Sequence, residues 1–379
     1  MTAEEASTRA LHVGTPSGGY EVVIADGILD RVAERCREVA GAHRYAVIAD
    51  SQVARLYGAR VRRAFDEAGE TVDLLVFPAG EWNKTREQWA LLSDRLLELG
   101  LGRDAAIVAL GGGVAGDLGG FVAATYMRGI PVIQVPTTLL AMLDSSVGGK
   151  TGVDTGGGKN LVGAFHHPSL VLIDPRVLET LPRHQRAAGL AEAIKTAAIL
   201  DVRLWQWIED HAEGLIGGEP GLLSSLVGRV VRHKIDVVAA DPLETDRRAI
   251  LNFGHTIGHA LEALEGFSLL HGEAVAAGMR VETRLGERLG VTARGTSERL
   301  SALLEACELD REWEAERSPA DVLEALSRDK KTLEARLRCV FLREIGRTAT
   351  DPTGRHTLQI DPAALEASLP PALRPGSED

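Results

Sequence analysis

The sequence has little of what several protein classes require. Its three cysteines, Cys36, Cys307 and Cys339, are far apart and form no C-x-x-C pair, which argues against a disulfide framework and a thiolate zinc site. Lys and Arg number 42 against 54 Asp and Glu, for a net charge of −12. No positive surplus is present to bind nucleic acid or an anionic membrane. We therefore expect neither partner.

Targeting and membrane signals are also missing. Residues 1–5 lack the basic start and apolar core of a signal peptide. The most apolar long region, residues 105–143, is interrupted by glycines 111–113, Asp117, Arg128 and Pro131, so it does not qualify as a membrane span. These absences predict a cytoplasmic protein.

Hydrophobic periodicity predicts two parts with different architecture. Residues 20–174 alternate β-branched runs with amphipathic stretches, which indicates βαβ units around a mainly parallel sheet. After Pro182 helical patterns dominate. The predicted strands are residues 20–24, 44–50, 71–77, 105–110, 131–135 and 170–174, with 337–342 far beyond. The predicted helices are residues 31–40, 85–99, 186–200, 202–213, 221–239, 249–265, 272–289, 297–307 and 319–329. This pattern predicts an α/β nucleotide-binding domain followed by an all-α domain, with a boundary near residues 175–182.

A glycine-rich segment, residues 111–117, follows the predicted strand 105–110. Glycines allow the backbone to approach a pyrophosphate closely, and a following helix N-terminus supplies N–H donors. Alone, this G-x-G-x-x-G match also fits an ordinary tight turn. Polar residues after other predicted strands, namely Asp50, residues 81–84 and Thr137-Thr138, strengthen it, because ligands of open α/β sheets bind at the carboxyl ends of strands. Together they favour a nucleotide.

Histidines and a carboxylate suggest a second kind of site. His255 and His259 are four residues apart on one face of a predicted helix, and His271 follows 12 residues later. Glu192 and Lys195 lie three residues apart on another helix, where an exposed ion pair is the ordinary interpretation. A single histidine is more often structural, but this grouping favours a metal or a proton relay. One glutamate with two histidines leaves coordination positions open, as in catalytic zinc sites.

Charged side chains also lie on glycine-rich segments at Arg128, residues 144–150 and residues 156–160. Such segments beside a nucleotide edge favour an anionic substrate. Solvated loop charges are the alternative.

In this order, the segments resemble the 3-dehydroquinate synthases, a branch of the sugar-phosphate cyclase family whose fold is shared with glycerol and iron-dependent alcohol dehydrogenases. The resemblance spans about residues 50–346. The matching motifs are GGGVAGDLGGFVAATYMRG, PTTLLAMLDSSVGGKTGVD, GKNLVGAFHHP, LETLP, GLAEAIKTAAI, LNFGHTIGHALE, HGEAVAAGM and DKK. So many ordered motifs make the resemblance specific.

The resemblance implies a Rossmann-like NAD-binding domain at residues 1–178 and a helical domain for metal and substrate at residues 179–379. It implies zinc or cobalt held by Glu192, His255 and His271. NAD would contact Asp50, Glu81, Lys84, Gly113, Val114, Ala115, Gly116, Asp117, Thr137, Thr138, Lys150, Lys159, Leu178, Glu179 and Thr180. The substrate would be surrounded by Arg128, Asp144, Lys150, Asn160, Lys195, Lys234, Arg248, Asn252, His259, Lys330 and Lys331. A homodimer is also implied.

The implied activity converts 3-deoxy-D-arabino-heptulosonate 7-phosphate into 3-dehydroquinate and phosphate, a step of the shikimate pathway toward aromatic amino acids. NAD would take and return a hydride, so the reaction has no net redox change. One alternative is a sibling cyclase acting on another sugar phosphate. The other is a metal-dependent polyol or alcohol dehydrogenase, but those relatives generally carry Asp where this chain has Glu192, and they lack the anion-binding cluster of Lys150, Lys159, Asn160 and Lys195.

Overall fold

The computed structural model of the chain describes residues 9–15, 18–156, 158–242, 244–266, 269–310, 319–329 and 337–369. The chain divides into two compact units. The first comprises Met1–Leu181 with Leu223–Pro242, and the second Pro182–Leu222 with Leu243–Asp379. The division into an NAD-binding part at residues 1–178 and a metal-binding part at residues 179–379 stays a prediction. In the structure, most of helix α8 (Pro220–Ala240) groups with the first unit.

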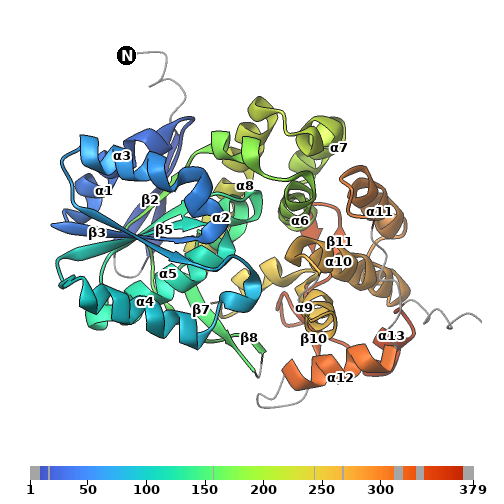
Figure 1. Cartoon of the computed structure of the whole chain (residues 1–379). Helices are drawn as coiled ribbons and strands as arrows, with labels where there is room; N and C mark the ends of the chain where they lie inside the picture. The colour runs from blue at the N-terminus through green and yellow to red at the C-terminus, as the bar shows by residue number, and fades with distance from the viewer. Residues whose placement is uncertain are drawn as a thin grey trace, which may run out of the picture. The chain divides into compact units, whose positions relative to one another are not determined.

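The first unit is built on a seven-stranded sheet with the order β1-β2-β9-β6-β5-β3-β4 among the described residues (Figure 1). Its strands are β1 (Arg9–Thr15), β2 (Gly18–Ile24), β3 (Arg44–Asp50), β4 (Val72–Phe77), β5 (Ala105–Gly111), β6 (Val132–Pro136) and β9 (Leu170–Ile173). All neighbours pair in parallel except β1 with β2. The predicted parallel sheet is confirmed, and β1 is a strand that the sequence analysis missed.

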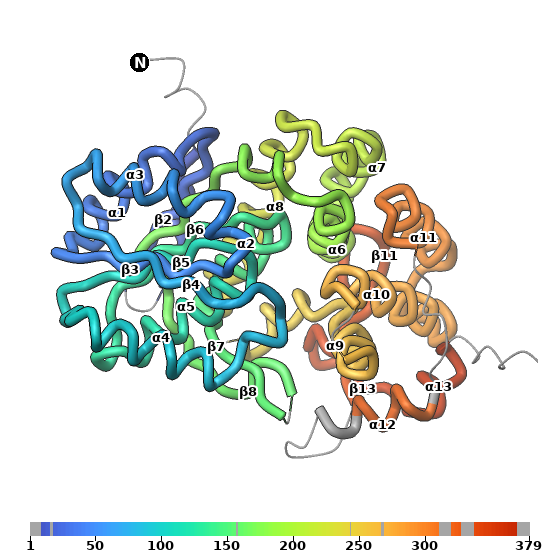
Figure 2. The backbone as a smooth tube through the Cα atoms, in the orientation of Figure 1, coloured from blue at the N-terminus to red at the C-terminus, as the bar shows by residue number. Residues whose placement is uncertain are grey.

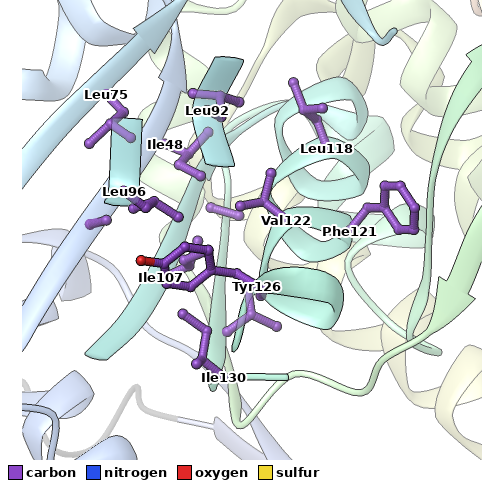
Figure 3. Close-up of a cluster of buried hydrophobic side chains, with 14 of the residues drawn as sticks. Ile48, Leu75, Leu92, Leu96, Ile107, Leu118, Phe121, Val122, Tyr126 and Ile130 are labelled. Atoms are coloured by element: carbon purple, nitrogen blue, oxygen red, sulfur yellow. The ribbon is translucent and has the colours of Figure 1, made fainter. Parts of the chain in front are cut away.

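Helices cover both faces of this sheet (Figure 1). One face carries α1 and α3, which pack together, and the other carries α4 and α5. The helical segments are η2 (Ile28–Arg31), α1 (Val32–Ala40), α2 (Ser51–Val53), η3 (Ala54–Gly58), α3 (Ala59–Glu67), η4 (Glu81–Asn83), α4 (Arg86–Glu98), α5 (Gly113–Thr125), η5 (Tyr126–Arg128), η6 (Ala141–Ser145) and η7 (Pro175–Thr180). Figure 3 shows the core on the α4 and α5 side, where Ile48 and Ile107 of the sheet meet Leu96, Leu118 and Val122 of the helices. Burial of this apolar surface stabilises the layers.

The stretch at residues 150–165, which contains the glycine-rich segment 156–160, is more regular than the sequence analysis predicted, because no strand was predicted there. It forms an antiparallel hairpin of β7 (Lys150–Thr155) and β8 (Gly158–Phe165). Gly152 and Gly163 face each other, and a Cβ on Gly163 would lie 2.1 Å from the carbonyl oxygen of Thr151. The glycines therefore permit close strand pairing. The sequence analysis missed this hairpin because a glycine-rich composition is typical of loops.

Helices dominate the described part of the second unit, which also contains two small antiparallel ladders, β10 with β13 and β11 with β12. Its elements are α6 (Arg183–Leu200), α7 (Val202–Gly217), η8 (Arg247–Asn252), α9 (His255–Leu264), α10 (His271–Arg288), α11 (Thr296–Ala306), α12 (Pro319–Asp329), β10 (Arg338–Cys339), β11 (Leu342–Glu344), β12 (Arg347–Thr348), β13 (Leu358–Gln359) and α13 (Pro362–Glu366). Figure 2 traces α9 and α10, which pack directly against each other. The predicted helix 249–265 is wrong in its first part, because Gly254 adopts a φ of 80° and separates η8 from α9.

Within the described ranges, no helix combines the length and apolarity needed to cross a bilayer.

Candidate active site

The strand ends of the first unit bring several predicted nucleotide residues to one edge of the sheet. Because β6, β5, β3 and β4 are neighbours, the segments after these strands lie side by side. Gly111 ends β5 with a φ of 157°, and its carbonyl accepts the N–H of Thr137 at 2.8 Å. Asp50 ends β3 and caps α2, and its Oδ2 lies 3.6 Å from where a Cβ on Gly111 would stand. These contacts place Asp50, the glycine turn and Thr137 together, as predicted for a nucleotide site.

Helix α5 begins at this turn and packs very closely on the sheet and on the β7–β8 hairpin. A Cβ on Gly116 would lie 2.9 Å from Oε1 of Gln134, and one on Gly120 would lie 2.5 Å from Cγ2 of Thr151. Gly112 serves as the N-cap without a side-chain hydrogen bond to the helix. The N-terminal N–H groups of a 13-residue helix therefore sit at the sheet edge, where they favour an anion.

A buried lysine joins three segments of the same unit. The ammonium of Lys84 lies 2.8 Å from Oε1 of Glu81, 3.3 Å from Oδ2 of Asp117 and 3.7 Å from Oδ1 of Asp154. The ammonium of Lys159, on β8, lies 3.5 Å from the same Glu81 oxygen. The structure thus brings together four residues predicted to contact NAD.

The charges in this cluster shift each other's pKa values. Burial disfavours the Lys84 ammonium, but the carboxylates of Asp117, Glu81 and Asp154 outweigh burial and raise the pKa of Lys84. Burial raises the pKa of Asp117 to about 6, although Lys84 acts in the opposite direction. A carboxyl group that titrates near pH 6 can form a hydrogen bond with a ligand hydroxyl in both protonation states. It accepts the bond when ionised, and it can donate one when protonated.

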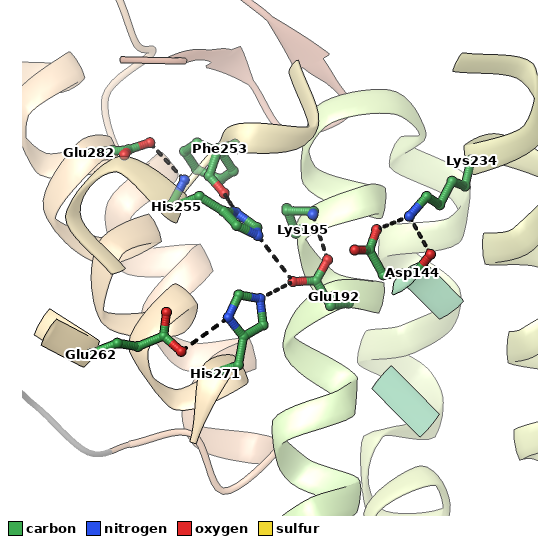
Figure 4. A network of polar contacts seen from close by, with 10 residues as sticks. Asp144, Glu192, Lys195, Lys234, Phe253, His255, Glu262, His271 and Glu282 are labelled. Carbon is green, nitrogen blue, oxygen red and sulfur yellow. Dashed lines mark hydrogen bonds and ion pairs between the residues drawn. The ribbon is translucent and has the colours of Figure 1, made fainter. Parts of the chain in front are cut away.

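The second unit contains a buried polar centre around Glu192 (Figure 4). One carboxylate oxygen of Glu192 lies 2.5 Å from the ammonium of Lys195, and the other faces Nε2 of His255 at 3.6 Å and of His271 at 3.5 Å. The side chains of Glu192 and Lys195 are 1% and 2% exposed. The ordinary interpretation of this pair, an exposed helical ion pair, is therefore wrong, because α6 is buried on every side from Arg186 to Ile199.

The geometry of this centre fits a divalent metal. One ligand atom from each of Glu192, His255 and His271 lies within 4.8 Å of the others. Two ligands about 2.0–2.1 Å from a tetrahedral zinc ion are roughly 3.3–3.5 Å apart, close to the two observed N···O distances of 3.5 and 3.6 Å. One carboxylate and two imidazoles also form the donor set of catalytic zinc. The ligand atoms of the three side chains are therefore already spaced to coordinate such an ion.

Glycines allow the helices that carry the metal-centre residues to approach each other closely. A Cβ on Gly272 of α10 would lie 1.8 Å from the carbonyl oxygen of Ala188 on α6. A Cβ on Gly278 would lie 1.9 Å from the carbonyl oxygen of Gly254, at the start of α9. Only glycine permits these approaches, which bring His255 and His271 to Glu192.

The two histidines have opposite pKa shifts. Burial, with help from the Lys195 charge, lowers the pKa of His255 well below its ordinary value. Burial also acts against the charged form of His271, but hydrogen bonds to Glu192 and Glu262 outweigh it and raise the pKa of His271 to about 10. The two carboxylates thus favour positive charge at His271, whereas His255 stays neutral.

The residues predicted to surround the substrate have varied environments. Lys234 of α8 pairs with Asp144, with Nζ 2.6 Å from Oδ1. Arg128 is exposed at the turn after α5 with a φ of 70°, and Asn160 adopts a φ of 54°. Left-handed conformations are uncommon for residues other than glycine and concentrate at functional sites. Lys150 is exposed at the start of β7.

The remaining predicted substrate residues belong to the second unit. Asn252 donates from Nδ2 to Oε1 of Glu244 at 2.8 Å, and Arg248 is 2% exposed. The exposed His259 has its ring centroid 5.3 Å from that of His255. Lys330 and Lys331 lie outside the described residues.

Three residues predicted to contact NAD, Leu178, Glu179 and Thr180, lie on η7 of the first unit. There the Thr180 hydroxyl contacts the Tyr57 hydroxyl at 2.6 Å.

Sequence reasoning missed two carboxylates of these clusters. Asp154 accepts the N–H of Asn160 at 2.8 Å, and Glu262 lies 3.4 Å from Nδ1 of His271. Glu262 had a detectable signal, because it follows His255 by seven residues and so shares its helix face. No sequence signal identified Asp154, because the hairpin that positions it was not predicted.

Comparisons with known proteins agree with this architecture. Two family models match, described as 3-dehydroquinate synthase N-terminal over residues 74–188 and C-terminal over residues 189–332. A 3-dehydroquinate synthase of Caulobacter vibrioides (strain NA1000 / CB15N) is 45% identical over 368 residues, covering 95% of this chain and 98% of the relative. That of Xanthomonas campestris pv. campestris (strain 8004) is 45% identical over 354 residues, covering 91% and 94%.

Solved structures extend the likeness to the fold. A 2-deoxy-scyllo-inosose synthase complexed with carbaglucose-6-phosphate, NAD+ and Co2+ has a TM-score of 0.88 at 28% identity, covering 95% of this chain and 99% of that one. A 2-epi-5-epi-valiolone synthase from Streptomyces hygroscopicus subsp. jinggangensis 5008, with NAD+ and Zn2+ bound, has a TM-score of 0.85 at 28% identity, covering 94% and 97%. The fold is thus that of the sugar-phosphate cyclases. Within this class, the chain belongs to the 3-dehydroquinate synthase family.

Proposed function

We propose that this chain is an NAD- and metal-dependent lyase that converts 3-deoxy-D-arabino-heptulosonate 7-phosphate into 3-dehydroquinate and phosphate. The observation that carries this proposal is the buried Glu192–His255–His271 centre, in a chain about 45% identical to 3-dehydroquinate synthases over most of its length. Glutamate at the first ligand position favours this activity over that of the dehydrogenases.

The residues of the second unit would hold the metal and order its ligands. Glu192, His255 and His271 offer one carboxylate and two imidazoles, while Lys195 fixes the second oxygen of Glu192. A divalent ion bound there would supply Lewis-acid polarisation of substrate oxygens. Zinc and cobalt both suit this donor set.

The residues of the first unit would hold the cofactor. The glycine turn and the N-terminus of α5 suit a pyrophosphate, and the cluster of Glu81, Lys84, Asp117 and Lys159 offers donors and acceptors for hydroxyl groups. NAD bound there would accept a hydride and return it. Because the cofactor ends in its starting state, small amounts of it suffice.

Cationic side chains would bind the substrate's phosphate and carboxylate. Arg128, Lys150, Lys195, Lys234, Arg248, Lys330 and Lys331 fill this role in the proposal, together with Asp144, Asn160, Asn252 and His259. Charge-assisted hydrogen bonds to phosphate are strong enough to orient a sugar phosphate.

Substrate choice separates this proposal from its two rivals. We expect a far higher kcat/KM with the heptulosonate phosphate than with glucose 6-phosphate, which resembles the carbaglucose-6-phosphate bound by the inosose synthase. A preference for glucose 6-phosphate would identify a sibling cyclase instead. Accumulation of NADH with a polyol, without phosphate release, would identify a dehydrogenase.

We also propose that the chain forms a homodimer in the cytoplasm, as the resemblance to the family implies. Light scattering should then give twice the chain mass of 40.5 kDa. A particle of 40.5 kDa at working concentrations would contradict the dimer.

A further inference from the structure

The two histidines of the metal centre are anchored in different ways (Figure 4). Nδ1 of His255 lies 3.2 Å from the carbonyl oxygen of Phe253, and Nδ1 of His271 lies 3.4 Å from Oε1 of Glu262. A carbonyl and an ionised carboxylate are both acceptors, so each Nδ1 must carry the proton. A metal bound to these rings therefore takes the lone pair of Nε2, once that nitrogen of His271 has lost its proton to the solvent, and Nε2 faces Glu192 in both cases.

His271 needs such an anchor more than His255 does. Both residues begin a helix, but the side chain of His271 is 29% exposed, against 11% for His255. A ring at a helix end with one open side can rotate about χ1 and χ2 unless a partner holds its far nitrogen. The Glu262 side chain, only 1% exposed, is fixed by its place on α9 and provides that partner.

Glu262 also forms a possible second ligand group with His259 and His271. The two groups share His271, but Glu192 and Glu262 face opposite nitrogens of its ring. A nitrogen that donates its proton to a carboxylate has no lone pair for a metal. The arrangement therefore supports one ion at Nε2, with Glu262 behind the ring.

We propose that Glu262 is a positioning residue of the metal centre, which accepts a hydrogen bond from Nδ1 of His271 and so fixes the tautomer and rotation of that ring. The inference rests on the ligand assignment in the proposed function. Carboxylates behind a metal-ligating histidine orient the ring and strengthen its basicity, and their loss typically costs about 10- to 100-fold in metal affinity.

The test measures Zn2+ affinity of the full-length protein by competition with a chromophoric chelator, without substrate. We expect Glu262→Gln, which keeps an acceptor but loses the charge, to raise the dissociation constant roughly 10-fold, and Glu262→Ala to raise it up to about 100-fold. Glu305→Gln, a matched change of an exposed carboxylate on α11, should leave it unchanged. Wild-type affinity in both Glu262 variants would overturn the proposal.

Two further measurements separate the positioning role from misfolding and from direct ligation of the metal. Urea denaturation of the metal-free variants reports folding, and Glu262→Gln serves the test if Glu262→Ala does not fold. Visible absorption of the Co2+-loaded protein reports the ligands: Glu262→Gln and His259→Ala should keep the wild-type band pattern. If the Co2+ spectra of both variants instead show the loss of a metal ligand, Glu262 itself binds the metal, and its positioning role is overturned.

The outcome is separable from the proposed function. If the wild-type protein turns over the heptulosonate phosphate while both Glu262 variants bind Zn2+ normally, the activity stands and the positioning role fails. If the variants lose Zn2+ affinity while the wild type shows no turnover, the positioning role stands and the activity fails.

Discussion

At the scale of single residues, the buried carboxylate of Glu192 contacts three other side chains of the second unit. It meets the Lys195 ammonium with one oxygen and two imidazole nitrogens with the other. A buried charge is tolerated only when it is paired. Because Glu192 lies on α6, loss of its partners at the metal centre should also destabilise that helix.

Replacing this carboxylate by an amide tests the ligand assignment. We expect Glu192→Gln to lose bound metal and turnover together, because the amide oxygen is a much weaker ligand and no longer balances Lys195. Metal content by atomic emission and phosphate release from the substrate report the two losses. An active, metal-replete variant would show that Glu192 is not a ligand.

The pKa of Asp117 predicts a pH dependence of stability in the first unit. Because its pKa is raised from 3.8 to about 6 in the folded state, the folded chain binds this proton more tightly than the unfolded chain. The contribution favours folding fully below about pH 4 and is lost as the pH rises through about 6.

Asp117→Asn keeps the neutral state at every pH, so its advantage over the wild type should grow across that window. We expect the variant to be more stable by on the order of 1–3 kcal/mol above pH 6, and equally stable near pH 4. Urea denaturation midpoints of the cofactor-free protein at several pH values measure the difference. A difference that does not change with pH would contradict the shifted pKa.

At the scale of elements, the sequence predicted most helices and strands but not the contacts between them. Helices 202–213 and 272–289 correspond to α7 and α10 within a few residues. Strand β1 and helix α3 were not predicted, and two further failures occur at glycines. Gly254 interrupts a helix that periodicity alone extends to residue 249, and Gly152 and Gly163 pair in a hairpin that composition marks as a loop. Glycine permits several backbone conformations, so only tertiary contacts decide among them.

The contact between α6 and α10 depends on one such glycine. A methyl group at position 272 would lie 1.8 Å from the carbonyl oxygen of Ala188, so Gly272→Ala should force the helices apart and move His271 away from Glu192. We expect a loss of about 1–3 kcal/mol or more in unfolding free energy, with weaker Zn2+ binding. Calorimetry and chelator competition measure the two effects.

Gly217→Ala is the matched control, because it also replaces a helical glycine of the second unit but its Cβ would meet no atom within 4 Å. Its stability should be unchanged or raised by up to about 1 kcal/mol through helix propensity. Equal behaviour of the two variants would show that the close approach at Gly272 is unimportant.

At the scale of the whole molecule, each unit carries its own core and its own cluster of functional side chains. The first contains the glycine turn and the Lys84 cluster, and the second contains the Glu192 centre. The order of motifs along the chain predicted both clusters and the family. The supporting carboxylates Asp154 and Glu262 could not be assigned in this way, because their roles depend on side-chain contacts rather than on motif spacing.

The central claim is that the metal centre and a recycled cofactor act together in one lyase reaction. The most direct measurement follows phosphate release from 3-deoxy-D-arabino-heptulosonate 7-phosphate with NAD far below the substrate concentration. We predict many turnovers per NAD, no net NADH, loss of activity with a chelator and recovery on adding Zn2+ or Co2+. Phosphate release that persists in the chelated protein, or one NADH formed per turnover, would contradict this mechanism.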